Sequence, residues 1–292
     1  MELDLTQLRH LIEEMPAYRR LVDELKQADG SPRVAVLDAA KPYFVASLYR
    51  HLLRTMLVVT ARPEDSKKLY EQVSTWCPSG EVQLFPEPDV LPYERIAADN
   101  STEMARLRVL SALAGMVEDG NTSLIIASAP ALMHKVTPYI DFVAAGYTVR
   151  SGMEVEPFHL LDEWQAMGYR LEDMVEVPGT MSHRGGIIDI YPTTSDLPAR
   201  LEFFGNTVDS IRLFDPANQR SLRAVSSLVV TPATELLAPL RNNTAEIEAV
   251  LSNIDLTGLS PEVRQQFQQE LAMLLGGERL EKHPRISCAG LG

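Results

Sequence analysis

A lysine near the start of the chain stands where a nucleotide-binding fold would place its phosphate loop. A β-like run from Arg33 to Leu37 leads through Asp38-Ala-Ala-Lys-Pro into a helical pattern. A working phosphate loop needs glycines, so that backbone N–H groups can approach the phosphates, and a Ser or Thr after the lysine to bind Mg²⁺. No glycine lies between Leu37 and Lys41, and Pro42 has neither an N–H nor a hydroxyl. We therefore expect a degenerate site at Lys41 and no cofactor bound to this segment.

Histidine, cysteine and carboxylate residues show no spacing typical of catalysis or metal binding. None of the six His residues pairs with another at metal-ligand spacing, and the two Cys residues form no redox motif. His183 beside Arg184, with Asp189 downstream, has the residue types for acid–base chemistry, but a strand start beside Gly185-Gly186 explains them as well. No nucleophile elbow or dinucleotide fingerprint occurs. We predict no catalytic residue and no metal site.

The run from Arg200 to Phe204 has the residue types of a binding surface. Period-2 alternation places Leu201 and Phe203 on one face of a strand. It places Arg200, Glu202 and Phe204 on the other face. Two charges and an aromatic ring facing away from the core suit a protein interface. The pattern alone favours a solvated strand face with one exposed Phe, since scattered exposed apolar residues are normal.

These residues lie in a predicted strand meander from Gly168 to Asp215. Four short β-rich runs are separated by Pro-Gly, Gly-Asn and the turn-rich segment 192–198. An amphipathic helix is predicted before the meander, at 158–167, and another strand after it, at 225–231. Upstream, the pattern alternates between strands at 33–37, 56–60, 82–85 and 123–127 and helices at 43–53, 63–75 and 101–117. Such alternation predicts an α/β fold with a parallel sheet covered by helices on both faces.

Charge and composition favour a protein partner. The 292 residues carry a net charge of −13, which argues against a surface that coats DNA through Lys and Arg contacts to phosphates. Residues 133–216 alone hold six basic and thirteen acidic residues. Few cysteines without a redox motif suggest the reducing cytoplasm. Neither a signal peptide nor a long apolar run appears, so we expect no membrane segment.

Four blocks of the meander resemble the UvrB-like module of the bacterial transcription-repair coupling factor (Mfd) family. They are Ala166-Met-Gly-Tyr-Arg170, the run from His183 to Pro192, the run from Leu197 to Phe204, and Ser210-Ile-Arg-Leu-Phe-Asp215. In that family the matching domain recruits UvrA, the damage-recognition ATPase of nucleotide excision repair. The resemblance implies UvrA contacts at Arg170, Arg184 and Glu202, with Arg200 and Phe204 as neighbours on the same face. UvrB has a further arginine where Ser182 stands, so the contact set differs.

The resemblance also implies three domains. Residues 1–132 would form a degenerate UvrB-like, helicase-like α/β domain, and 133–216 an inserted UvrA-binding α+β domain with the antiparallel meander. Residues 217–292 would form part of a helical domain, with helices at 246–251 and 261–275, in a truncated fragment of a longer protein. The whole family protein is an ATP-driven DNA translocase that displaces stalled RNA polymerase. Its ATP, Mg²⁺, DNA and polymerase sites would lie outside this segment, which we predict to be non-catalytic.

The alternative interpretation is a divergent UvrB-like protein that uses ATP and loads on damaged DNA. The missing glycines before Lys41 count against it. So does the short stretch from Tyr93 to Glu103, which has no aromatic residue between its ends and no room for a DNA-clamping hairpin. An unrelated α/β enzyme would have to match the four blocks by chance.

Overall fold

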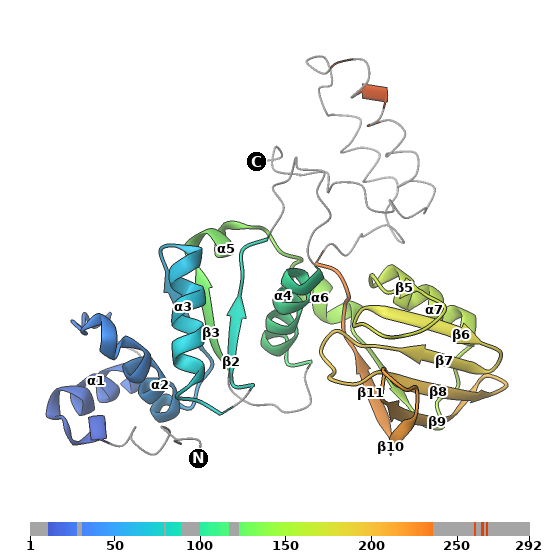
Figure 1. Cartoon of the computed structure of the whole chain (residues 1–292), viewed down its shortest axis with the longest axis horizontal. Helices are drawn as coiled ribbons and strands as arrows, with labels where there is room; N and C mark the ends of the chain where they lie inside the picture. The colour runs from blue at the N-terminus through green and yellow to red at the C-terminus, as the bar shows by residue number, and fades with distance from the viewer. Residues whose placement is uncertain are drawn as a thin grey trace.

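The computed structural model describes residues 11–27, 31–78, 80–88, 100–116, 123–235, 260, 264–265 and 267. The predicted helix at 246–251, most of the predicted helix at 261–275 and most of the stretch between Tyr93 and Glu103 lie outside these residues. In Figure 1 the described elements form an N-terminal part built on β1 to β3 and a second part built on β5 to β10. Helix α1 (Pro16–Gln27) begins at a proline, whose missing N–H costs nothing at a helix start.

A three-stranded parallel sheet forms the centre of the N-terminal part. Its strands β1 (Met56–Thr60), β2 (Val82–Phe85) and β3 (Leu124–Ser128) lie in the order β1-β3-β2. Strand β3 runs parallel to both neighbours, which confirms the predicted parallel sheet. The helices around it are α2 (Lys41–Leu52), α3 (Pro63–Ser74), α4 (Asn100–Leu113) and α5 (Ala129–Met133).

Helices cover this sheet unevenly. On one face, residues of α2 and α3 pack over Leu124 and Ile126 of β3. On the other face, residues of α4 and α5 pack over β2 and β3. Leu57 and Val59 of β1 point to that second side, yet both remain about half exposed. The prediction of a sheet covered on both faces is therefore confirmed for β3 and wrong for the outer side of β1.

The predicted buried strand at 33–37 does not form. These residues adopt no strand, and Val34 and Leu37 are largely exposed. The segment leads instead into a 3₁₀ turn (Asp38–Ala40) that precedes α2. A run of apolar residues is a local signal, whereas a parallel strand also needs a neighbouring strand to accept its hydrogen bonds. Among the described strands β1 pairs only with β3, so 33–37 adds nothing to the sheet.

A six-stranded sheet forms the second part. Its strands are β5 (Arg170–Leu171), β6 (Thr180–Arg184), β7 (Ile187–Ile190), β8 (Ala199–Phe204), β9 (Thr207–Phe214) and β10 (Ser221–Val225). They lie side by side in chain order, antiparallel from β6 to β10, which confirms the predicted meander. The sheet continues past residue 216 through β10. Beyond it, β11 (Ser227–Val230) pairs with β4 (Tyr147–Arg150), which follows α6 (Tyr139–Ala145).

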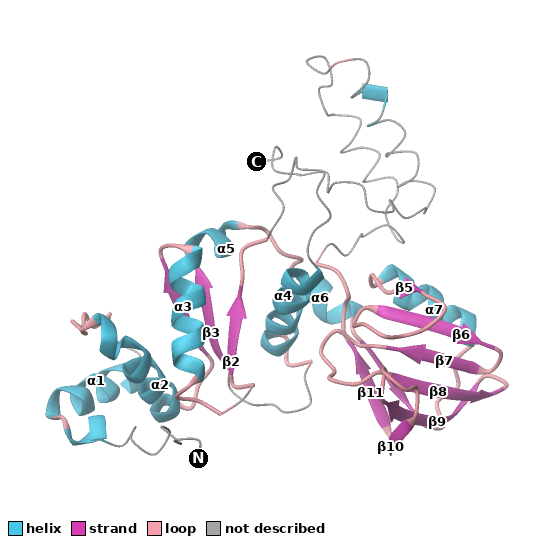
Figure 2. Cartoon of the chain, in the orientation of Figure 1, coloured by secondary structure: helices cyan, strands magenta, loops and turns pink. Residues whose placement is uncertain are grey.

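Helix α7 (Pro157–Ala166) closes one face of this sheet (Figure 2). Its start is set by Pro157 and by the Glu156 carboxylate, which accepts hydrogen bonds from two backbone N–H groups of the first turn. Leu160 and Trp164 of α7 are fully buried in one cluster with apolar side chains of β6 to β9. The predicted amphipathic helix is confirmed, and its apolar side fixes which face of the sheet is the core.

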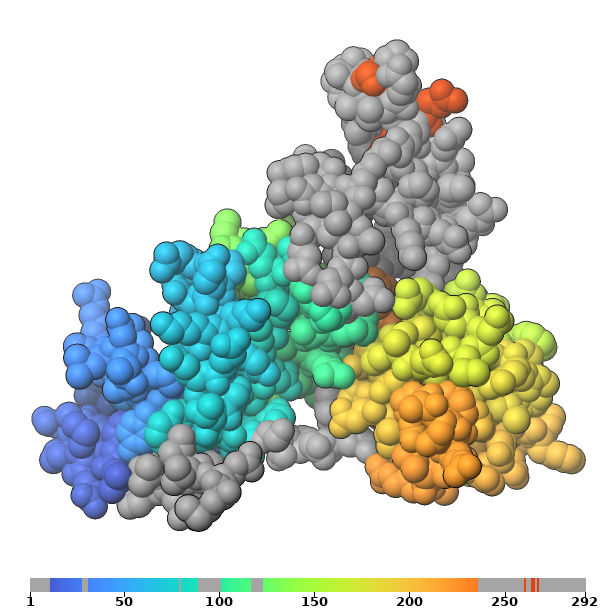
Figure 3. All heavy atoms as spheres, in the orientation of Figure 1, coloured from blue at the N-terminus to red at the C-terminus, as the bar shows by residue number. Residues whose placement is uncertain are grey.

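The two parts meet where α4 touches the segment that follows β11. Figure 3 shows the atoms of the two parts side by side. Arg106 of α4 forms a two-pronged ion pair with Glu235, with N–O distances of 2.5 and 3.0 Å. Arg108 donates to the Thr193 backbone oxygen at 3.2 Å. The segment also passes close to Gly168, whose φ is +106° and where a Cβ would lie 2.9 Å from backbone atoms of residues 233 and 234. Only glycine suits that position.

Candidate protein-docking face

The predicted binding residues lie on the sheet face opposite α7, which we call the outer face. Pairing between β7 and β8 sets Asp189 beside Arg200 and Ile187 beside Glu202, and paired residues share a face. Leu201 is buried and Phe203 packs against the core, as the alternation predicted. A bulge between Glu202 and Phe203 leaves this alternation intact.

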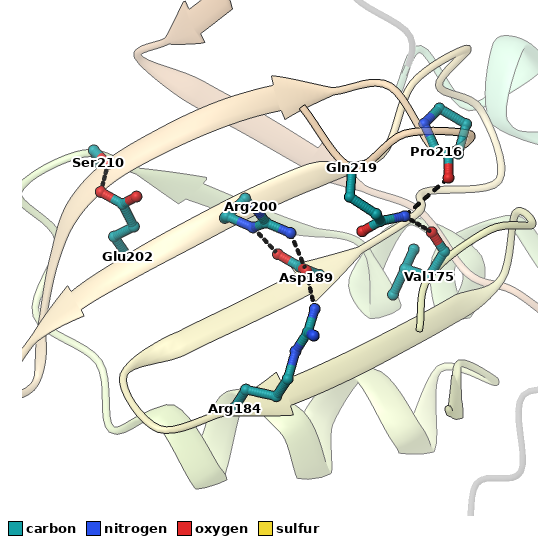
Figure 4. Close-up of polar contacts among 8 residues, drawn as sticks. All are labelled: Val175, Arg184, Asp189, Arg200, Glu202, Ser210, Pro216 and Gln219. Atoms are coloured by element: carbon teal, nitrogen blue, oxygen red, sulfur yellow. Dashed lines mark hydrogen bonds and ion pairs between the residues drawn. The ribbon is translucent and has the colours of Figure 1, made fainter. Parts of the chain in front are cut away.

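Asp189 is the centre of the outer face (Figure 4). Its carboxylate is 1% exposed, and its two oxygens accept from Arg200 Nε at 2.7 Å and Arg200 Nη2 at 2.8 Å. The same carboxylate accepts from Arg184 Nη2 at 3.4 Å. The hydrogen bonds to Asp189 raise the pKa of the Arg200 guanidinium above its ordinary value. The two arginines neutralise the buried Asp189 carboxylate and donate hydrogen bonds to it, because a buried charge without a partner is strongly destabilising.

A second polar group surrounds Glu202. Its Oε2 atom accepts a hydrogen bond from Ser210 Oγ at 2.7 Å and lies 3.4 Å from Arg212 Nη2. Both partners come from β9, the strand next to β8. Phe204, two residues along β8, is 84% exposed where the strand turns at Gly205. A carboxylate held in place beside an exposed ring is an arrangement suited to recognition of a protein surface.

The far end of the outer face is closed. Val175, Tyr191 and Phe214 form a small buried cluster there, and the Gln219 side chain donates to the backbone oxygens of Val175 and Pro216 (Figure 4). The open part of the face is therefore the end that carries Arg184, Glu202 and Phe204.

Arg170 lies at the edge of the same sheet, in β5. It pairs with Thr180, and Arg184 stands four residues further along β6, which corresponds to about 13 Å along a strand. The structure thus places all five predicted residues on one face without gathering them into one cluster. Arg184 and Arg200 share Asp189, Glu202 belongs to the Ser210 group, and Arg170 stands apart.

Asp189 was not among the predicted binding residues. The signal was present, because an Asp inside the run Ile187-Ile-Asp-Ile is almost always paired when it is buried. Asp189 and His183, whose residue types would allow acid–base chemistry, lie on opposite faces of the sheet. His183 is the strand partner of Ile188 and its ring contacts Phe158 at the start of α7, on the core side of the sheet. Asp189 points to the outer face.

At the predicted degenerate site, backbone N–H groups of the turn before Lys41 are hydrogen-bonded within the turn. The Ala40 N–H donates to the Leu37 oxygen and the Lys41 N–H to the Asp38 oxygen, so both groups are occupied within the turn. Lys41 Nζ lies 2.6 Å from Asp38 Oδ1, and this hydrogen bond lowers the pKa of the Asp38 carboxyl. Across the described ranges, no three His, Cys, Asp or Glu side chains are grouped to hold a metal ion. Nor does any described helix have the length and apolarity to cross a membrane.

Residues 148–236 match the family model of the UvrB interaction domain. The matched range begins in β4 and ends just after Glu235, so it contains the whole six-stranded sheet, α7 and β11. All five predicted binding residues and Asp189 lie within residues 148–236, which we call the interaction domain after the model that they match.

Most of the chain is also similar to longer repair proteins. It is 27% identical to a transcription-repair-coupling factor of Bacillus subtilis over 248 residues, which is 85% of this chain and 21% of that protein. Against the coupling factor of Myxococcus xanthus it is 30% identical over 227 residues, 75% of this chain and 19% of the relative. The UvrABC system protein B of Pseudothermotoga lettingae is 26% identical over 251 residues, 82% of this chain and 38% of the relative. The chain therefore spans about a fifth of the coupling factors it matches.

Proposed function

We propose that this chain is a recruitment module of transcription-coupled nucleotide excision repair, and that its interaction domain binds UvrA through the outer face. The observation that carries the proposal is the match of 148–236 to the UvrB interaction domain, joined to an open sheet face on which Arg184 and Phe204 are exposed. The chain shares a higher percentage of identical residues with the two coupling factors than with the UvrABC system protein B. This difference favours a role in transcription-coupled repair.

The proposal extends to the longer protein of which the chain is a part. That protein would be an ATP-dependent DNA translocase that acts on stalled RNA polymerase in the cytoplasm, with its DNA, polymerase, ATP and Mg²⁺ sites outside this segment. The docking unit within the chain would run from β4 to β11, because β11 pairs with β4 and completes the domain. The segment itself would then work by binding alone.

A direct binding measurement tests the proposed function. We expect the full 292-residue chain, immobilised on a sensor, to capture purified UvrA in a saturable manner with no ATP, DNA or polymerase added. Bovine serum albumin, an acidic protein without a repair function, serves as the control analyte. Failure of a chain with a cooperative thermal melt to capture UvrA contradicts the proposal.

Nucleotide binding separates the proposal from the UvrB-like alternative. Because the N–H groups of the Lys41 turn are occupied and Lys41 is paired with Asp38, we expect no heat of ATP–Mg²⁺ binding in isothermal titration calorimetry. We expect Lys41→Ala to leave the titration unchanged. Saturable ATP binding that disappears in Lys41→Ala would instead favour an ATP-dependent, UvrB-like protein.

A further inference from the structure

Arg184 and Arg200 both contact the buried carboxylate of Asp189, but Arg200 makes more and shorter hydrogen bonds to it than Arg184 does. Arg200 is 19% exposed, gives two short hydrogen bonds to Asp189 and lies with its Cζ 4.8 Å from the centroid of the Phe214 ring. Arg184 is 56% exposed and makes one contact at 3.4 Å from a single terminal nitrogen. An arginine has five N–H donors. Arg200 is thus engaged in the sheet, whereas Arg184 contacts Asp189 through one nitrogen only.

The neighbours of Arg184 define what its free donors can meet. Its strand partner Ile187 is partly exposed, and Ile187 is in turn the partner of Glu202. The carboxylate of Glu202 already accepts a hydrogen bond from Ser210 and lies beside Arg212. The open end of the outer face therefore presents an arginine with spare donors, an apolar side chain and the exposed Phe204 ring.

We infer that Asp189 is a positioning residue, which holds Arg184 from behind so that its outer donors face a carboxylate on the partner. Arg200 is the structural counter-ion of Asp189 and not a contact. This inference rests on the proposed function, because it assigns roles within the UvrA-binding face. The surface of UvrA that binds here would carry an acidic group opposite Arg184 and, next to it, an apolar surface that contacts Phe204. A two-pronged arginine–carboxylate pair has the directionality that such positioning serves.

A double-mutant cycle tests the inference in the full chain with purified UvrA. Asp189→Asn keeps the side-chain shape and removes the charge, and Arg184→Ala removes the group that Asp189 is proposed to position. We expect each single variant to weaken UvrA binding at least tenfold, and the double variant to bind no more weakly than Arg184→Ala. Arg150→Ala, which replaces an exposed arginine of β4 outside the six-stranded sheet, should bind within twofold of the unmutated chain.

Two results overturn the inference. One is unchanged affinity in Asp189→Asn. The other is an equal loss from Asp189→Asn with and without Arg184, since a general loss of structure acts independently of Arg184.

A second measurement uses the unmutated chain without UvrA, so it remains informative if Asp189→Asn does not fold. It also distinguishes failure of this inference from failure of the proposed function. The NMR order parameter of the Nε–Hε bond in the unmutated chain should be higher for Arg184 than for Arg150. Equal order parameters contradict the positioning role whether or not UvrA binds. If Arg184 is ordered but the unmutated chain does not bind UvrA, the proposed function fails, while the contact between Asp189 and Arg184 stands.

Discussion

Replacing Arg184 by glutamate should abolish capture of UvrA and leave the fold intact. Arginines at interface centres are often hot spots, and their truncation commonly costs about 2 kcal/mol or more of binding free energy. Charge reversal adds repulsion against the acidic group that Arg184 is proposed to meet. The fold tolerates the change because Arg184 is 56% exposed and Asp189 keeps its two hydrogen bonds to Arg200. The affinity should fall more than tenfold in a sensor assay, with an unchanged circular dichroism spectrum.

Two matched charge reversals control for bulk electrostatics. Lys67→Glu lies on the exposed side of α3 in the N-terminal part, and Arg150→Glu lies in the interaction domain but outside its six-stranded sheet. Both make the same change in net charge as Arg184→Glu, and both should bind UvrA within twofold of the unmutated chain. If all three reversals weaken capture equally, the effect comes from overall charge and the docking face is assigned wrongly.

The strand alternation around Glu202 could be predicted from sequence because it is a local property. A residue's side of a strand depends only on whether its position is odd or even, so Leu201 and Phe203 identify the core face without knowledge of any other strand. The paired partners are a different matter. That Asp189 lies beside Arg200 depends on the length of the turn between β7 and β8, which sets the register. The sequence pattern therefore identified the face but missed the carboxylate at its centre.

The strand predicted at 33–37 is a case in which the local pattern predicted an element that does not form. Its apolar residues meet the local requirement for a buried strand, as those of β1 do. Strand β1 forms because β3, almost seventy residues later, pairs with it from Met56 to Thr60. No described strand does the same for 33–37. Local pattern predicts which segments can be strands, and only the assembled sheet decides which ones are.

The junction of the two parts was the least predictable feature. From sequence, Arg106 could be either solvated or ion-paired. In the structure it is 1% exposed, and its partner Glu235 is 129 residues away. Arg106 also donates to the Pro86 oxygen at 2.7 Å and lies over the Phe85 ring. No rule of sequence spacing relates residues that are so far apart in the chain. The sequence around Arg106 therefore does not indicate that Glu235 is its partner.

Replacing Glu235 by alanine should destabilise the chain strongly. The change leaves the Arg106 guanidinium buried with the Pro86 oxygen as its remaining hydrogen-bond partner. Breaking a buried ion pair by removing one member typically costs about 3–5 kcal/mol of unfolding free energy. Urea denaturation followed by tryptophan fluorescence measures the loss. Trp76 packs against the core of the N-terminal part and Trp164 lies in the core of the interaction domain, so each part has its own reporter.

Two further variants show whether the uncompensated charge is the cause. Arg106→Met combined with Glu235→Leu removes both charges and keeps apolar volume, so it should lose less than half as much stability as Glu235→Ala. Asp65→Ala breaks an exposed pair with Arg62 and should leave the urea midpoint nearly unchanged. If the double variant is as unstable as Glu235→Ala, packing at the junction is what matters. If Glu235→Ala behaves like Asp65→Ala, the contact between α4 and the segment after β11 does not hold the two parts together.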